Sequence, residues 1–108
     1  MQRYDELIEL VKRAQIDVGL LVVNAGHFMM GDLAEAKASE MQALMDLNMY
    51  HPTAMLKKFI PMLTERDKKS GLIIMSSITG RACMPGIAIE SSTKAYLSYL
   101  GAAIEQEL

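Results

Sequence analysis

The sequence Gly71-Leu72-Ile73-Ile74-Met75-Ser76-Ser77-Ile78-Thr79-Gly80 is an apolar run that closes on two serines and a glycine. It predicts a buried strand that ends in a turn. A second apolar run, Val18-Gly19-Leu20-Leu21-Val22-Val23, lies upstream and ends at Asn24-Ala25-Gly26. Both runs are continuous rather than alternating, which is typical of parallel strands covered on both faces.

Two segments beside these runs have the apolar spacing of helices. Residues 1–15 place apolar side chains on one face and charges elsewhere, which predicts an amphipathic helix. A second helix is expected over residues 39–65, with Ser39 as its N-cap. Pro52 lies inside this helix, so we expect a kink or a break near His51.

The remaining segments complete an α/β order. Residues 27–37 are small and polar and predict a loop, and a last helix is expected to begin near Ser91 or Ser92. The predicted order is helix, strand, helix, strand, helix, with a right-handed crossover between two parallel strands. Because a two-stranded parallel sheet leaves edges and faces bare, we expect the central part of a larger doubly wound sheet, or a chain completed by partners.

Size and composition exclude several classes of protein. The chain has 108 residues, half of them apolar, with thirteen acidic against eleven basic side chains. It has no basic stripe for nucleic acid and no apolar run long enough to span a membrane, and its acidic first residues predict no signal peptide. The single Cys83 suits a reducing intracellular compartment, cytoplasmic or organelle-associated. His27 and His51 lack partners at ligand spacing, so no metal site is expected.

The order of four short motifs carries a resemblance to a known family. Thirteen residues after Ser77 comes Glu90-Ser91-Ser92-Thr93-Lys94. This layout resembles the Ser…Tyr-x-x-x-Lys site of the short-chain dehydrogenase/reductase family, with Glu90 in the tyrosine position. The likeness covers nearly the whole chain and is greatest to the hydroxysteroid (17-beta) dehydrogenase and long-chain 3-oxoacyl reductase branch. It implies a Rossmann-type fold.

The resemblance implies roles for particular residues. Asn24, Ala25 and Gly26 match the turn that lies against the adenine side of the dinucleotide. Asn48 matches a helix asparagine that holds a water beside the lysine, Ser77 matches the serine that hydrogen-bonds the substrate oxygen, and Lys94 matches the lysine that binds the nicotinamide ribose. Taken alone, Ser77 is also explained as a strand-end serine, Lys94 as a solvated helix lysine, and Asn48 as a residue beside the Pro52 irregularity.

The family's Gly-rich cofactor loop has no counterpart in this sequence. No Gly-x-x-x-Gly-x-Gly occurs, and the C-terminal substrate segment of the family has no counterpart either. Residues 1–108 are therefore expected to form a partial domain. The implied cofactor is NADP or NAD, and the residue that selects between them belongs to a segment upstream.

Glu90 changes what the site is expected to do. The family's tyrosine donates a proton to the alkoxide formed on ketone reduction, whereas a glutamate is ionised near neutral pH and cannot donate. Glu90 and Lys94 are spaced for a helix ion pair of about 0.3–0.5 kcal/mol. Tyr50, Tyr96 and Tyr99 do not reproduce the missing geometry.

A methionine stripe suggests an assembly surface. Met41, Met45 and Met49 recur at i, i+4 and i+8, which is explained by core packing or by an interface. In the resembling family the corresponding helices, here 41–64 and 92–108, pack against a second subunit. A homo-oligomer or larger assembly through these helices is slightly favoured.

Two functions remain open. The first is an NAD(P)-dependent oxidoreductase domain acting on a ketone or hydroxyl of a steroid or fatty-acyl-like substrate, impaired in this chain by Glu90. The second is a degenerate, non-catalytic family member that serves as a structural or interaction subunit.

Overall fold

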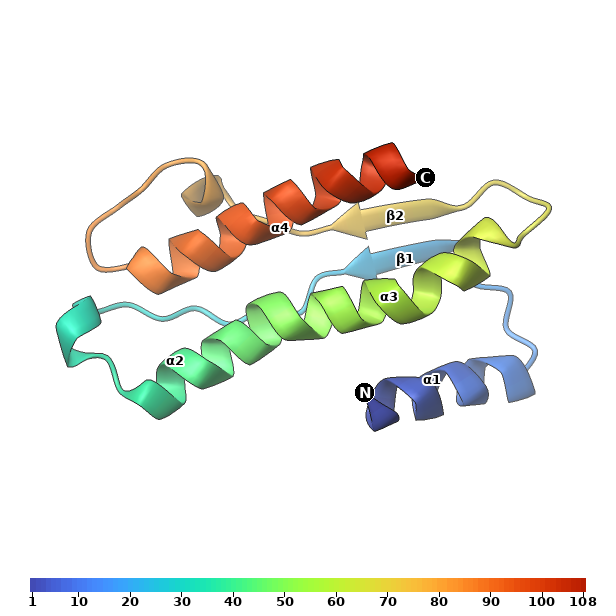
Figure 1. Ribbon diagram of the computed structural model, residues 1–108, viewed down its shortest axis with the longest axis horizontal. Helices are drawn as coiled ribbons and strands as arrows, with labels where there is room; N and C mark the ends of the chain where they lie inside the picture. The colour runs from blue at the N-terminus through green and yellow to red at the C-terminus, as the bar shows by residue number, and fades with distance from the viewer.

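The fold is one layer of helices over a two-stranded sheet (Figure 1). The computed structural model describes residues 1–108 and measures 48 × 27 × 16 Å. None of its helices combines the length and the hydropathy that crossing a bilayer requires. The elements in chain order are α1 (Gln2–Arg13), β1 (Leu20–Val23), the 3₁₀ turn η1 (Leu33–Glu35), α2 (Ala38–Met45), the π-helical η2 (Asp46–Tyr50), α3 (His51–Thr64), β2 (Gly71–Ile74), the 3₁₀ turn η3 (Ile78–Gly80) and α4 (Ala88–Glu107).

The two strands pair in parallel, as the apolar runs predict. Leu20 lies opposite Gly71 and Val23 opposite Ile74. In Figure 1 both arrows point the same way, toward the turns that begin at Asn24 and Met75. The α/β order and the parallel pairing are therefore confirmed, and the polar residues after each strand meet at one end of the sheet.

Only one face of the sheet is covered in this chain. The core cluster joins β1 to three helices, through Ile8, Val11, Leu21, Val23, Leu56, Phe59, Leu63 and Ile104. On the opposite face Leu20, Val22 and Ile73 are 55, 48 and 45 % exposed. All the helices that pack on the sheet through this core lie on one side, so the second face stays bare, as expected of a partial sheet.

The helix boundaries differ from the sequence prediction in three places. The second helix begins at Ala38 with Lys37 as its N-cap, and no side chain caps it, so Ser39 is not the cap. Its expected break appears as the π-helical η2, which separates α2 from α3. The last helix begins at Ala88, before Ser91 and Ser92, and the buried Ile87 is its N-cap.

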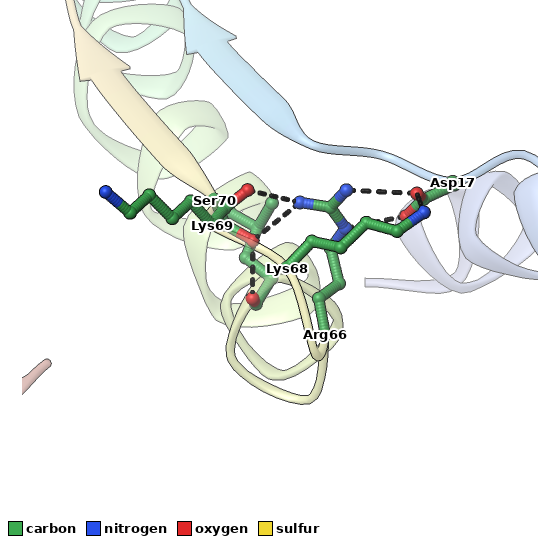
Figure 2. A network of polar contacts seen from close by, with 6 residues as sticks. Asp17, Arg66, Lys68, Lys69 and Ser70 are labelled. Atoms are coloured by element: carbon green, nitrogen blue, oxygen red, sulfur yellow. Dashed lines mark hydrogen bonds and ion pairs between the residues drawn. The ribbon is translucent and has the colours of Figure 1, made fainter.

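A polar network fixes the start of both strands (Figure 2). The Arg66 guanidinium donates two hydrogen bonds to the Asp17 carboxylate, at 2.6 and 2.9 Å, and one to the Lys69 carbonyl at 2.7 Å. It also donates to the Ser70 hydroxyl, which in turn donates to the Leu63 carbonyl. Asp17 precedes β1 and Ser70 precedes β2, so this one arginine ties together the two chain segments that enter the sheet.

The same network makes stability depend on pH. Hydrogen bonds from Arg66 hold the pKa of the Asp17 carboxyl below its ordinary value of 3.8. A lowered folded-state pKa means that the pair stabilises the fold above the unfolded-state value, and that this contribution is lost as the pH falls through the folded-state value. We expect Asp17→Asn to remove part of the acid-induced loss of stability below about pH 4, measured as urea midpoints from pH 2 to pH 7. Asp32→Asn, at an aspartate whose side chain makes no cap bond, is the control, and parallel curves for wild type and Asp17→Asn would contradict the prediction.

Candidate active site

Asn48 occupies the middle of the π-helical turn η2, and the sequence explains why the helix widens there. Pro52 has no N–H to donate to the carbonyl four residues earlier, that of Asn48, and its ring crowds that carbonyl. The chain responds with a π-type bond from the His51 N–H to the Asp46 carbonyl. The Asn48 side chain is fully buried.

The Asn48 amide joins the end of β1 to α4. Its Oδ1 accepts a hydrogen bond from the His27 N–H at 2.7 Å, and its Nδ2 donates to the His27 carbonyl at 2.9 Å. The same Nδ2 donates to the Thr93 hydroxyl at 3.0 Å, and Thr93 donates onward to the Glu90 carbonyl. One side chain thus fixes the turn that follows Asn24-Ala25-Gly26 relative to the helix that carries Lys94.

Lys94 reaches toward that turn. A Cβ atom built on Gly26 would stand 3.1 Å from the Lys94 Nζ and 3.4 Å from the Asn48 Oδ1, so a side chain there would crowd both. The half-buried Lys94 forms no ion pair, because no carboxylate lies within 4.0 Å of its Nζ. The predicted ion pair between Glu90 and Lys94 is therefore wrong. The side chain points to the Gly26 turn that follows β1 and not along α4.

The two serines after β2 have different partners. Ser77 caps η3 by accepting a hydrogen bond from the Thr79 N–H at 3.3 Å. Ser76 donates to the Lys94 carbonyl at 2.7 Å and accepts from the Ser98 hydroxyl at 2.8 Å. Ser77 therefore stands at the expected strand end and makes no hydrogen bond to Asn48, Glu90 or Lys94, whereas its neighbour Ser76 anchors the helix.

Gly80 lets η3 pack against α4. A Cβ atom at Gly80 would lie 2.7 Å from the Lys94 carbonyl carbon and 2.9 Å from the Ala95 nitrogen. Both of these are backbone atoms, so no side-chain movement could relieve the overlap. This close approach fixes the backbone of α4 at Lys94 relative to η3.

Glu90 lies on the same helix and is buried. It is 4 % exposed, and its Oε2 is buried with no hydrogen-bond partner. A buried carboxylate oxygen without a donor is costly, so nothing in the fold explains a preference for glutamate at this position. No group of three histidine, cysteine, aspartate or glutamate side chains is placed to hold a metal ion.

The structure thus brings Asn48 and Lys94 together at Gly26, the last residue of the Asn24-Ala25-Gly26 turn. Ser77 lies at the turn after β2, and Glu90 lies one turn before Lys94 on α4. Sequence reasoning missed Ser76 and Thr93, which hold α4 in place. Ser76 lies in the stretch 71–80 and Thr93 in the stretch 90–94. Neither hydroxyl has a sequence pattern that predicts its hydrogen-bond partner.

The comparison with known proteins decides the family. The whole chain, residues 1–108, matches the short chain dehydrogenase family. The chain belongs to this family. It is 30 % identical over 107 residues to a very-long-chain 3-oxoacyl-CoA reductase from Neurospora crassa, covering 97 % of this chain and 31 % of that protein.

Solved structures of short chain dehydrogenases share the fold. A short-chain dehydrogenase from Streptomyces avermitilis superposes with a TM-score of 0.89 at 27 % identity, covering 98 % of this chain and 39 % of that one. A short chain dehydrogenase/reductase from Burkholderia phymatum, solved in complex with NAD, gives 0.91 at 21 % identity, covering 97 % of this chain and 37 % of that one. The chain therefore spans about a third of the length of these short chain dehydrogenases.

Proposed function

We propose that this chain is the central part of an NAD(P)-dependent oxidoreductase domain that acts on a ketone or hydroxyl group of a fatty-acyl or steroid-like substrate. The observation that carries the proposal is the meeting of the Gly26 turn, Asn48 and Lys94 at one end of the sheet. Membership of the short chain dehydrogenase family supports a nicotinamide cofactor as the source of hydride.

The residues present fit part of such a cofactor. The Lys94 ammonium makes no ion pair within the chain, so its three N–H donors are available to hydroxyl oxygens of a ribose. Gly26 has no side chain of its own, which leaves room for the Lys94 Nζ and the Asn48 Oδ1 beside its backbone. The Asn24-Ala25-Gly26 turn would flank the nucleotide, whereas the pyrophosphate needs a Gly-rich turn that the 108 residues do not contain. Nothing in these residues selects between NAD and NADP.

The substrate class rests on the relatives. The Neurospora crassa protein is named a very-long-chain 3-oxoacyl-CoA reductase. By analogy with that name, the substrate proposed for the whole protein is a long-chain acyl ketone. The steroid alternative rests on the likeness in sequence motifs alone. Ser77 would donate a hydrogen bond to the ketone oxygen, and Asn48 would order a water for the proton relay.

We further propose that Glu90 impairs proton transfer. A carboxylate at the tyrosine position places negative charge where an alkoxide must form, and an ionised group has no proton to donate. The same observation favours a second candidate function: a non-catalytic structural subunit that assembles through helices 41–64 and 92–108. Tyr50, Met45 and Tyr99 on these helices are 52, 38 and 83 % exposed, which supports a homo-oligomer or a larger assembly.

Nucleotide binding distinguishes the two functions. We expect the longest natural form of the protein to bind NADPH or NADH, and Lys94→Ala to weaken that binding at least about 10-fold, measured by isothermal titration. Lys57→Ala, at an exposed lysine without an ion pair, is the matched control. Absence of binding to both nucleotides, together with self-association in sedimentation velocity, would reject the oxidoreductase and leave the structural subunit.

A further inference from the structure

A cavity of about 440 Å³ lies between the start of α1 and the helix face that passes from α2 through η2 into α3. Tyr4 comes from α1, and the other residues of the wall recur about once per turn along that face: Ala43, Asp46, Leu47, Tyr50 and His51. None of the candidates for nicotinamide binding or catalysis lines this cavity. It is a separate feature of the chain with its own chemistry.

Three rings meet in the wall of this cavity. The centroids of Tyr4 and Tyr50 are 6.4 Å apart and their planes make an angle of 65°, and the centroids of Tyr4 and His51 are 5.7 Å apart at 42°. The Tyr4 hydroxyl and the His51 Nδ1 share a hydrogen bond of 3.2 Å, which fixes these two rings relative to each other. Tyr50 is 52 % exposed, so a ligand in solvent can reach its ring. The rings form an angled and accessible aromatic wall.

The charge of the wall is negative. Asp46 is exposed and belongs to no ion pair, and its carboxylate accepts one hydrogen bond, from the neutral Gln42 amide at 2.7 Å. The wall has no lysine or arginine. The faces of aromatic rings are electronegative and attract cations, and the unpaired carboxylate adds to that attraction. Charge complementarity therefore favours a cation with apolar surface.

We propose that this cavity binds the alkylated ammonium group of a small molecule. The methyl surface of that group packs on Tyr50 and Leu47, and its charge faces the tyrosine rings and the Asp46 carboxylate. A metal ion is disfavoured, because no three histidine, cysteine, aspartate or glutamate side chains are grouped to hold one. An anion is disfavoured by Asp46. The site needs neither a nicotinamide cofactor nor hydride transfer, so it is tested apart from the proposed oxidoreductase function.

The test is a titration of the longest natural form of the protein with choline, followed by NMR chemical shifts at constant ionic strength. The solution is held at about pH 8, at which a histidine side chain is ordinarily neutral. Neohexyl alcohol, in which carbon replaces the charged nitrogen of choline, is the neutral probe of the same shape. We expect choline to bind with a millimolar dissociation constant, and neohexyl alcohol to bind at least about threefold more weakly.

Variants at the wall separate ring and carboxylate. Tyr50→Ala removes one ring and weakens choline binding at least about threefold, whereas Tyr50→Phe keeps the ring and stays within about twofold of wild type. Tyr99→Ala, at a tyrosine of α4 that is 83 % exposed and outside the cavity, is the matched control and keeps the wild-type affinity.

Asp46→Asn weakens choline binding by about twofold or more, and Asp32→Asn, at an aspartate outside the cavity, does not. Three results overturn the proposal: absence of choline binding, equal affinities for choline and neohexyl alcohol, or choline binding that Tyr50→Ala leaves unchanged.

Discussion

Glu90→Tyr, placed in the longest natural form of the protein, raises the rate of ketone reduction by at least about 100-fold, the usual contribution of a positioned general acid. The reason is chemical: a phenol can both donate and accept the proton that moves as the alkoxide forms, and a carboxylate cannot donate it. The exchange also removes a buried carboxylate oxygen that has no donor. The measurement is the oxidation of NADPH with a 3-oxoacyl substrate, read as kcat/KM.

Glu90→Phe is the matched control for this experiment. It supplies the same ring without the hydroxyl, so a gain that arises from packing alone appears in both variants and a gain from proton transfer appears only with tyrosine. Circular dichroism spectra and melting points confirm that both variants fold. Equal rates for Tyr, Phe and wild type would mean that Glu90 does not occupy the proton-donor position.

Asn48→Ala lowers the free energy of unfolding by about 2–3 kcal/mol, since it leaves the N–H and C=O of His27 and the Thr93 hydroxyl without their partner. For a domain of this size the melting point falls by about 10 °C or more. Because these bonds tie the Gly26 turn to α4, the position of Lys94 loosens as well. We expect weaker nucleotide binding in parallel with the loss of stability.

Asn24→Ala is the control in the stability measurement, because Asn24 is exposed and its side chain makes no hydrogen bond. Asn48→Asp adds a finer test. It keeps an acceptor for the His27 N–H but loses the two donor bonds of Nδ2, and it sets a carboxylate oxygen against the His27 carbonyl. Its destabilisation is expected to match or exceed that of Asn48→Ala, and a neutral effect would contradict the hydrogen bonding described for Asn48.

Local signals predicted the elements and their order. The two continuous apolar runs predicted parallel strands, and the pairing of Leu20 with Gly71 confirms this. Pro52 predicted a break near His51, which the structure has as the π-helical η2. Pro52 acts on its own neighbours through a fixed φ and a missing N–H, so no distant contact is needed to infer that break.

Long-range contacts explain what sequence alone did not predict. Ser91 and Ser92 look like helix caps, yet α4 starts earlier, at Ala88, and the Ser92 hydroxyl donates back to the Ala88 carbonyl as a residue inside the helix does. Glu90 and Lys94 have the spacing of an ion pair, but Lys94 reaches across to Gly26 instead.

The anchoring of α4 by Ser76, Thr93 and Gly80 has a consequence for how this molecule can change over time. None of these three contacts involves the side chain at position 90. The side chain at position 90 can therefore change in evolution without loosening α4. A protein that loses its proton donor at this position keeps the fold in which a later substitution could restore it.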